Sequence, residues 1–65
     1  MLDSQIVNIL QEYFIEGLTV TDIITKLPDE FYDYQSISDR CMKLVDKGII
    51  KSYKNNNDAV VYKII

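Results

Sequence analysis

The chain opens with apolar residues at helical spacing. Positions i, i+3, i+4 and i+7 of this stripe are Ile6, Ile9, Leu10 and Tyr13. Such a stripe is typical of a helix that packs on one side. Asp3 or Ser4 can cap this helix at its start, and Gly17 ends it as a C′ glycine does. The pattern therefore predicts a first helix over about 4–16.

A second, shorter apolar stripe follows. Thr19 and Asp22 have the spacing of a capping box, and Pro28, which lacks an N–H, ends the helix after Leu27. We therefore expect a helix over about 20–27. The acidic and aromatic stretch 29–34 has no regular period and predicts a connection, under which Phe31, Tyr32 and Tyr34 either pack or form a protein-binding patch.

The third stripe is the clearest of the chain. Asp33 stands at the N-cap position and Gly48 at the C′ position of a helix over about 34–47. Its predicted buried face consists of Ile37, Cys41, Leu44 and Val45. The rest of its surface is polar and largely basic, so we expect an amphipathic helix held by its inner face.

After Gly48 the period changes from 3.6 to 2. Two runs rich in β-branched and aromatic residues flank the stretch NNND, where Asn and Asp tolerate the positive φ of a tight turn. This pattern predicts a β-hairpin over about 49–65, with Tyr53 and Tyr62 in its core or paired across its strands. The complete order of elements predicts one α+β domain over 1–65.

Composition excludes several classes of protein. No apolar run approaches the about 20 residues that a membrane helix needs, and no basic region precedes the first apolar residues as in a signal peptide. We therefore expect a cytoplasmic protein with no membrane contact. A single cysteine, no histidine and no glycine-rich phosphate loop predict no disulfide, no metal site, no catalytic residues and no cofactor.

The charge is unevenly distributed. The net charge is −3, but residues 1–39 carry eight acids and one base, whereas residues 40–65 carry six bases and two acids. Such a bipolar chain favours one face that meets a polyanion, although it would also steer two copies head to tail.

The stretch 36–50, SISDRCMKLVDKGII, is similar to the recognition-helix signature of bacterial, archaeal and viral winged-helix regulators. The order of elements over 18–65 resembles a winged helix-turn-helix domain, and the first helix fits as its opening helix. This resemblance implies a regulator of transcription that binds double-stranded DNA, with the third helix in the major groove and the hairpin as its wing.

The resemblance also implies a set of DNA-binding residues. On the third helix they are Gln35, Ser36, Asp39, Arg40, Lys43 and Lys47, and on the wing Lys51 and Lys54. Arginine suits guanine or a phosphate, glutamine suits adenine, and aspartate suits cytosine N4. The wing lysines would contact phosphates, which adds affinity without sequence information.

Two further possibilities concern partners. The alternative function is an acidic winged-helix module that binds a basic site on another protein, as small viral inhibitors and DNA mimics do. A homodimer would use Val7, Phe14 and Ile15 of the first helix, or the last strand, whose edge we expect to be open. The small size and the Asn-, Lys- and Ile-rich composition suit a phage, virus or plasmid.

Overall fold

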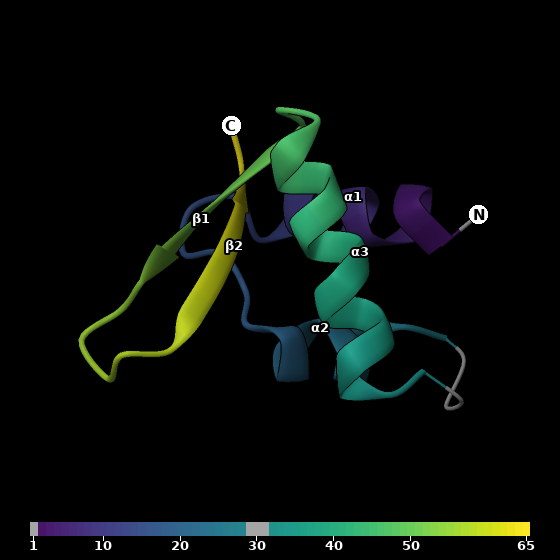
Figure 1. Ribbon diagram of the computed structural model, residues 1–65, viewed down its shortest axis with the longest axis horizontal. Coiled ribbons are helices and arrows are strands. Elements are labelled where there is room, and N and C mark those ends of the chain that lie inside the picture. The colour runs from purple at the N-terminus through teal and green to yellow at the C-terminus, as the bar shows by residue number, and fades with distance from the viewer. Residues whose placement is uncertain (1, 29–31) are drawn as a thin grey trace.

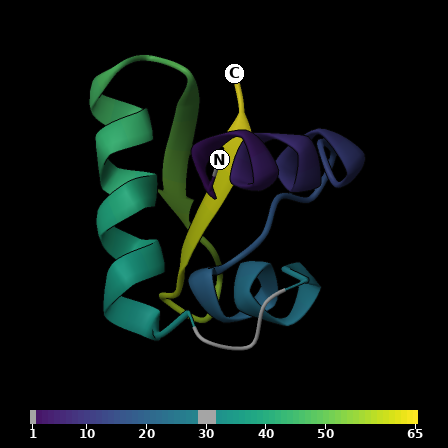
Figure 2. The same ribbon diagram turned by 90° about the vertical axis from the view of Figure 1, so that its right-hand side faces the viewer.

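The described residues form three helices followed by an antiparallel pair of strands. A computed structural model describes residues 2–28 and 32–65. In chain order the elements are α1 (Leu2–Glu12), α2 (Val20–Lys26), α3 (Tyr34–Asp46), β1 (Ile50–Lys54) and β2 (Val60–Ile64). In Figure 1 α3 lies in front of α1 and α2, and the hairpin extends to one side. Figure 2 shows α3 upright, with α1 and α2 lying across the other side of the molecule. The predicted α+β fold, three helices followed by a two-stranded hairpin, is confirmed, and its arrangement is consistent with a winged helix.

The first helix is shorter than predicted. It begins at Leu2, so Asp3 and Ser4 lie inside its first turn and do not cap it. It ends at Glu12, one turn before the predicted end, and turns lead on to Gly17. Gly17 is therefore not the C′ residue of α1, although its φ is 72° and its N–H donates to the carbonyl oxygen of Tyr13 (2.9 Å).

The second helix has the predicted caps. The Asp22 N–H donates to the hydroxyl oxygen of Thr19 (3.2 Å), and the Thr19 N–H donates to the Asp22 carboxylate (3.4 Å). This reciprocal pair confirms the capping box. Leu27 is extended (φ −74°, ψ 145°) because the following Pro28 disfavours the helical conformation, so the helix stops at Lys26.

The connection to α3 is described only in part. Its predicted start, including Phe31, lies outside the described residues. Tyr32 packs against the core, as expected. Tyr34 is 60% exposed, so the expectation that it packs under the connection is wrong. It is the first residue of α3, where the helix begins at the margin of the core.

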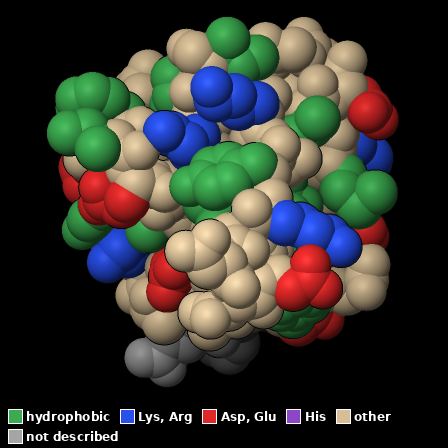
Figure 3. Space-filling model, turned by 90° about the vertical axis from the view of Figure 1, so that its left-hand side faces the viewer, with side chains coloured by type: hydrophobic (Ala, Val, Ile, Leu, Met, Phe, Trp, Pro, Cys, Tyr) green, Lys and Arg blue, Asp and Glu red, His purple; other side chains and the backbone are tan. Residues whose placement is uncertain are grey.

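The hairpin has two distinct faces. Its register pairs Ser52 with Tyr62 and Lys51 with Lys63. Alternate residues of a strand point to opposite faces, so the Ser52–Tyr62 pair and the Lys51–Lys63 pair lie on opposite sides of the hairpin. Tyr62 is buried in the core, whereas Lys51 is exposed on the opposite, outer side. Figure 3 views the molecule from the side to which the hairpin extends in Figure 1.

The loop of the hairpin has the predicted turn chemistry. The side-chain oxygen of Asn55 accepts hydrogen bonds from the N–H groups of Asn57 (2.9 Å) and Ala59 (3.1 Å). Asp58 has a φ of 63°, which confirms a positive φ within the stretch NNND.

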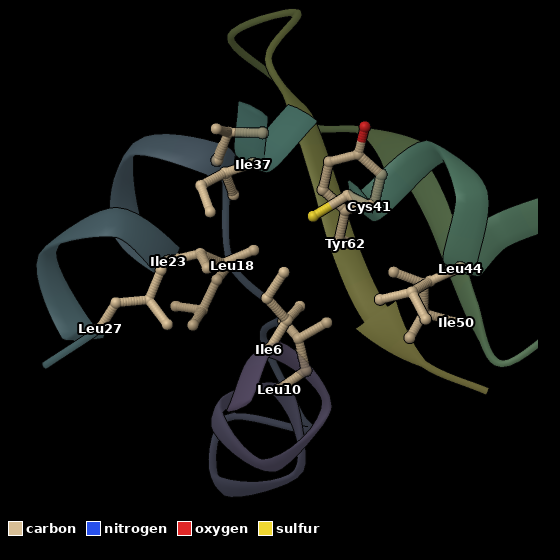
Figure 4. Close-up of a cluster of buried hydrophobic side chains, with 11 residues drawn as sticks. Ile6, Leu10, Leu18, Ile23, Leu27, Ile37, Cys41, Leu44, Ile50 and Tyr62 are labelled. Atoms are coloured by element: carbon tan, nitrogen blue, oxygen red, sulfur yellow. The ribbon is translucent and has the colours of Figure 1, made fainter. Parts of the chain in front are cut away.

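The core draws on every element, as Figure 4 shows. Its most completely buried large side chains are Ile6, Leu10, Ile23, Ile37, Ile50 and Cys41. The predicted inner faces of the helices are therefore confirmed, with Ile9, Tyr13, Ile24 and Val45 packed at the margin of the core. Tyr62 joins this core, and Tyr53, which is 42% exposed, pairs across the strands with Val61.

The segment after α1 covers the edge of the last strand. The Leu18 N–H donates to the Tyr62 carbonyl (2.9 Å), and the Tyr62 N–H donates to the Leu18 carbonyl (2.8 Å). The expectation of an open edge on the last strand is therefore wrong at this position. The periodicity of the sequence did not indicate the bridge between Leu18 and Tyr62, because a single bridged residue has no period.

Candidate nucleic-acid interface

The start of α3 is fixed by a side-chain cap. The Ser36 N–H donates to the Asp33 carboxylate at 2.8 Å, as the sequence predicts. Hydrogen bonds from the Ser36 side chain and N–H lower the pKa of the Asp33 carboxyl below its ordinary value. The negative charge of Asp33 also lies at the positive end of the helix dipole, which favours the ionised form.

The buried face of α3 decides which side chains point outward. Ile37 and Cys41 are completely buried and Leu44 nearly so. Burial, with a smaller effect from the charge of Asp3, raises the pKa of the Cys41 thiol to about 12. At neutral pH this thiol is protonated and packs as a small apolar group, so it has no part in a reactive site.

One flank of α3 is basic and faces α1. Arg40, Lys43 and Lys47 follow one another at i, i+3 and i+7, so they share this side of the helix. Arg40 and Lys43 line a hollow of about 370 Å³, whose full lining is Leu2, Tyr32, Ser36, Asp39, Arg40 and Lys43. Lys47 lines a neighbouring hollow of about 360 Å³ beside Val7. We call Ser36, Arg40, Lys43 and Lys47 the basic flank.

The basic flank is partly neutralised by α1. The Arg40 guanidinium lies 3.7 Å from the Asp3 carboxylate, with side chains 49% and 35% exposed. The distance is too long for a direct hydrogen bond, and Asp3 Oδ1 is buried without a hydrogen-bond partner among the described residues. This contact was not predicted, because no local pattern reveals which residue of α1 comes to lie beside α3.

The outermost side of α3 is polar and partly acidic. The Gln35 side-chain amide donates to the Asp39 carboxylate at 2.9 Å, one helical turn away. Met42 and Asp46 lie farther along, where α3 and the hairpin border a hollow of about 170 Å³. We call Gln35, Asp39, Met42 and Asp46 the outer ridge. It lies between the basic flank and the hairpin.

The wing lysines do not share one face. Lys54 is at the end of β1, on the same side of the hairpin as Ser52, and its ammonium lies 3.5 Å from the Asp58 carboxylate. Lys51 is on the opposite side, directly across from Lys63. The period of 2 in the hairpin already implied this separation of Lys51 from Lys54.

The structure therefore places the candidate residues in four separate positions. The basic flank brings together four of them, and the outer ridge holds Gln35 and Asp39 as a hydrogen-bonded pair. Lys54 ends β1 on the same side of the hairpin as Ser52, which borders the hollow beside the outer ridge. Lys51 points away from all of these. A single basic face that includes all the candidate cations is not formed.

Comparisons with known proteins give no relative for this chain. No family model, no curated protein and no solved structure matches it. Within residues 2–28 and 32–65, no helix is long and apolar enough to cross a bilayer. In the same ranges, no group of three or more His, Cys, Asp or Glu side chains is placed to hold a metal ion.

Proposed function

We propose that this protein is a winged-helix regulator that binds double-stranded DNA, with α3 in the major groove. The observation that supports the proposal is the position of cations on both sides of the outer ridge. Arg40 and Lys43 stand on the flank toward α1, and Lys54 stands on the wing. A polar ridge between two cationic margins is the arrangement that a groove bordered by two phosphate backbones requires.

The dimensions of DNA support the same arrangement. The major groove is about 12 Å wide, and a helix with its side chains is about 10–12 Å across, so α3 fills the groove. The basic flank then contacts the phosphates of one strand and Lys54 those of the other. Lys51 takes no part, because it lies on the other side of the hairpin.

The outer ridge supplies the groups that read bases. In the groove, Gln35 can pair with adenine N6 and N7, and Asp39 can accept from cytosine N4. The hydrogen bond between them fixes the orientation of both side chains before DNA arrives. Asp39 and Asp46 repel phosphate, so we expect modest affinity that falls steeply with salt. Such a role would place the protein inside the cell.

Fluorescence anisotropy with a labelled duplex, over about 50 to 200 mM salt, tests this proposal. Lys43→Ala and Lys54→Ala probe the two sides of the ridge. Each should weaken binding and reduce the slope of log affinity against log salt by about 1. Lys26→Ala is the matched control, because it removes the same charge from α2, where Lys26 lies over the ring of Tyr13. Equal slopes in all three variants would contradict the proposed geometry.

The second candidate is an acidic module that binds a basic site on another protein. The observation that favours it is the outer ridge itself, where Asp39 and Asp46 accompany Met42, which is 56% exposed. Acids around an adaptable apolar side chain suit a cationic protein surface. Retention on heparin and on DNA-cellulose at low salt favours the DNA-binding proposal, and flow-through on both favours this alternative.

A further inference from the structure

The outer side of the hairpin and the turn after α1 form one continuous surface. The Tyr53 hydroxyl donates to the Glu16 carbonyl oxygen at 2.9 Å, and Gly17 lies against Tyr62 and Lys63. These contacts place the turn beside the outer strand residues. We call this surface the outer hairpin face, and its members are Phe14, Ile15, Glu16, Lys51, Tyr53 and Lys63.

The outer hairpin face exposes large apolar side chains. Ile15 is 70% exposed, Phe14 59% and Tyr53 42%. Figure 3 shows hydrophobic side chains on this side of the molecule, with Lys and acidic side chains among them. A chain of 65 residues has few large apolar side chains to spare, so several of them exposed together indicate a contact surface.

Among the described residues, the charged side chains of this face have no partners of opposite charge within the same chain, and they could pair with those of a second chain. Lys51 and Lys63 are directly opposite each other across the strands, an arrangement that destabilises a hairpin. In the described part of the chain the ion pairs are Arg40–Asp3 and Lys54–Asp58, so neither lysine has a carboxylate within 4.0 Å. Glu16 is exposed in the turn that lies against Lys63, and in the described part of the chain no cation lies within 4.0 Å of it either.

We propose that two copies of this chain pair through the outer hairpin face, about a two-fold axis. A two-fold interface must be self-complementary, because each contact from one copy to the other occurs twice. A face that carries both an acid and a lysine pair without partners meets this condition. Glu16 of each copy then lies against Lys51 and Lys63 of the other, and Phe14, Ile15 and Tyr53 are buried between them.

The covered edge of the last strand favours this mode over strand addition. Leu18 already occupies the edge of β2 at Tyr62. β1 has β2 as its neighbour in the sheet, and its other edge carries Lys51 and Lys54, which discourage pairing with another strand. Val7, which we expected at the interface, packs against the core and is not part of this face. The outer ridge of α3 stays free, so the inference does not depend on DNA binding.

Sedimentation equilibrium without DNA, from low micromolar to submillimolar protein, tests the inference. We expect the mass to rise from 7.6 kDa toward twice that value, and to fall again at high salt. Ile15→Ser should weaken association by about tenfold or more, since it removes a central apolar contact. Met42→Ser, a similar loss from an exposed site on α3, is the matched control and should leave the mass unchanged.

Charge reversal separates this interface from other modes of association. Glu16→Lys should abolish the dimer, and the double variant Glu16→Lys with Lys63→Glu should restore it. The mass of one chain at every concentration would overturn the inference, and a partner protein would then have to cover the face. Association that Glu16→Lys does not affect, or that the double variant does not restore, would overturn it as well. Circular dichroism confirms that each variant is folded.

Discussion

Leu18 and Tyr62 exchange both of their backbone hydrogen bonds, at 2.9 and 2.8 Å, although they lie 44 positions apart in the sequence. This bridge fixes the turn after α1 against β2. The bridge also restricts which residue can stand at position 17, directly before Leu18. A Cβ on Gly17 would lie 2.8 Å from the Tyr62 carbonyl oxygen and 2.8 Å from Val61 Cγ1. Gly17 is therefore required both for its positive φ and for its lack of a side chain.

Gly17→Ala should destabilise the protein much more than Gly48→Ala. Both glycines have a φ above 70°, but an added Cβ meets nothing within 4 Å at Gly48. The left-handed conformation alone costs about 1 kcal/mol, which we expect for Gly48→Ala. The clash raises the loss for Gly17→Ala to about 3 kcal/mol. Urea denaturation measures both free energies of unfolding, and equal losses would show that the segment moves away from β2 at little cost.

The Cys41 thiol should be inert in the folded protein. It is completely buried and its pKa is raised to about 12, so the reactive thiolate is scarce at neutral pH. Ellman's reagent should therefore react only as fast as the protein unfolds, and the rate should rise with urea in step with the loss of circular dichroism. Rapid reaction of the native protein would mean that α3 opens locally at Cys41.

The fold could be predicted largely because its local signals agree with one another. The capping box at Thr19, the N-cap Asp33 and the positive φ at Gly48 each mark an element boundary that the apolar period also supports. The first helix was predicted less well. As a C′ glycine, Gly17 predicts its end at residue 16, but Phe14 and Ile15 face solvent and the chain turns toward the Leu18–Tyr62 bridge.

The candidate site could be predicted only in part. The period of 3.6 correctly separates the basic flank from the buried face of α3, and the period of 2 separates Lys51 from Lys54. The contact between Asp3 and Arg40 could not be predicted, since it depends on how α1 crosses α3. The net charge of residues 40–65 does not depend on the directions in which the side chains point. It therefore suggested one basic face, which the described residues do not form.

Asp33→Asn should reduce the loss of stability in acid. The pKa of Asp33 is lowered in the folded state, so the ionised cap stabilises the protein above the unfolded value of about 4, and this contribution is lost as the pH falls through the folded value. Asparagine can still accept the Ser36 N–H but does not titrate. The melting temperature of the variant should therefore fall less between about pH 5 and pH 2 than that of the parent. An equal fall in melting temperature in the two proteins over this pH range would contradict this role of Asp33.

Asp3 should act as an internal competitor for DNA. Its carboxylate lies 3.7 Å from the Arg40 guanidinium, where a phosphate would otherwise bind. If the proposed interface is correct, Asp3→Asn should tighten binding several-fold and steepen the salt slope by up to about 0.9, because one more cation becomes available. The pair is half exposed, so the same change should have little effect on stability.

A double-mutant cycle isolates this competition from a simple change in net charge. Glu12→Gln removes one negative charge from the other end of α1, where no cation of the described residues is paired with it, and should change affinity little. In an Arg40→Ala background, Asp3→Asn should also lose its effect, since the residue it competes for is gone. If Asp3→Asn instead weakens binding, and does so only when Arg40 is present, Asp3 orients the guanidinium toward the phosphate and the contact belongs to the binding site itself.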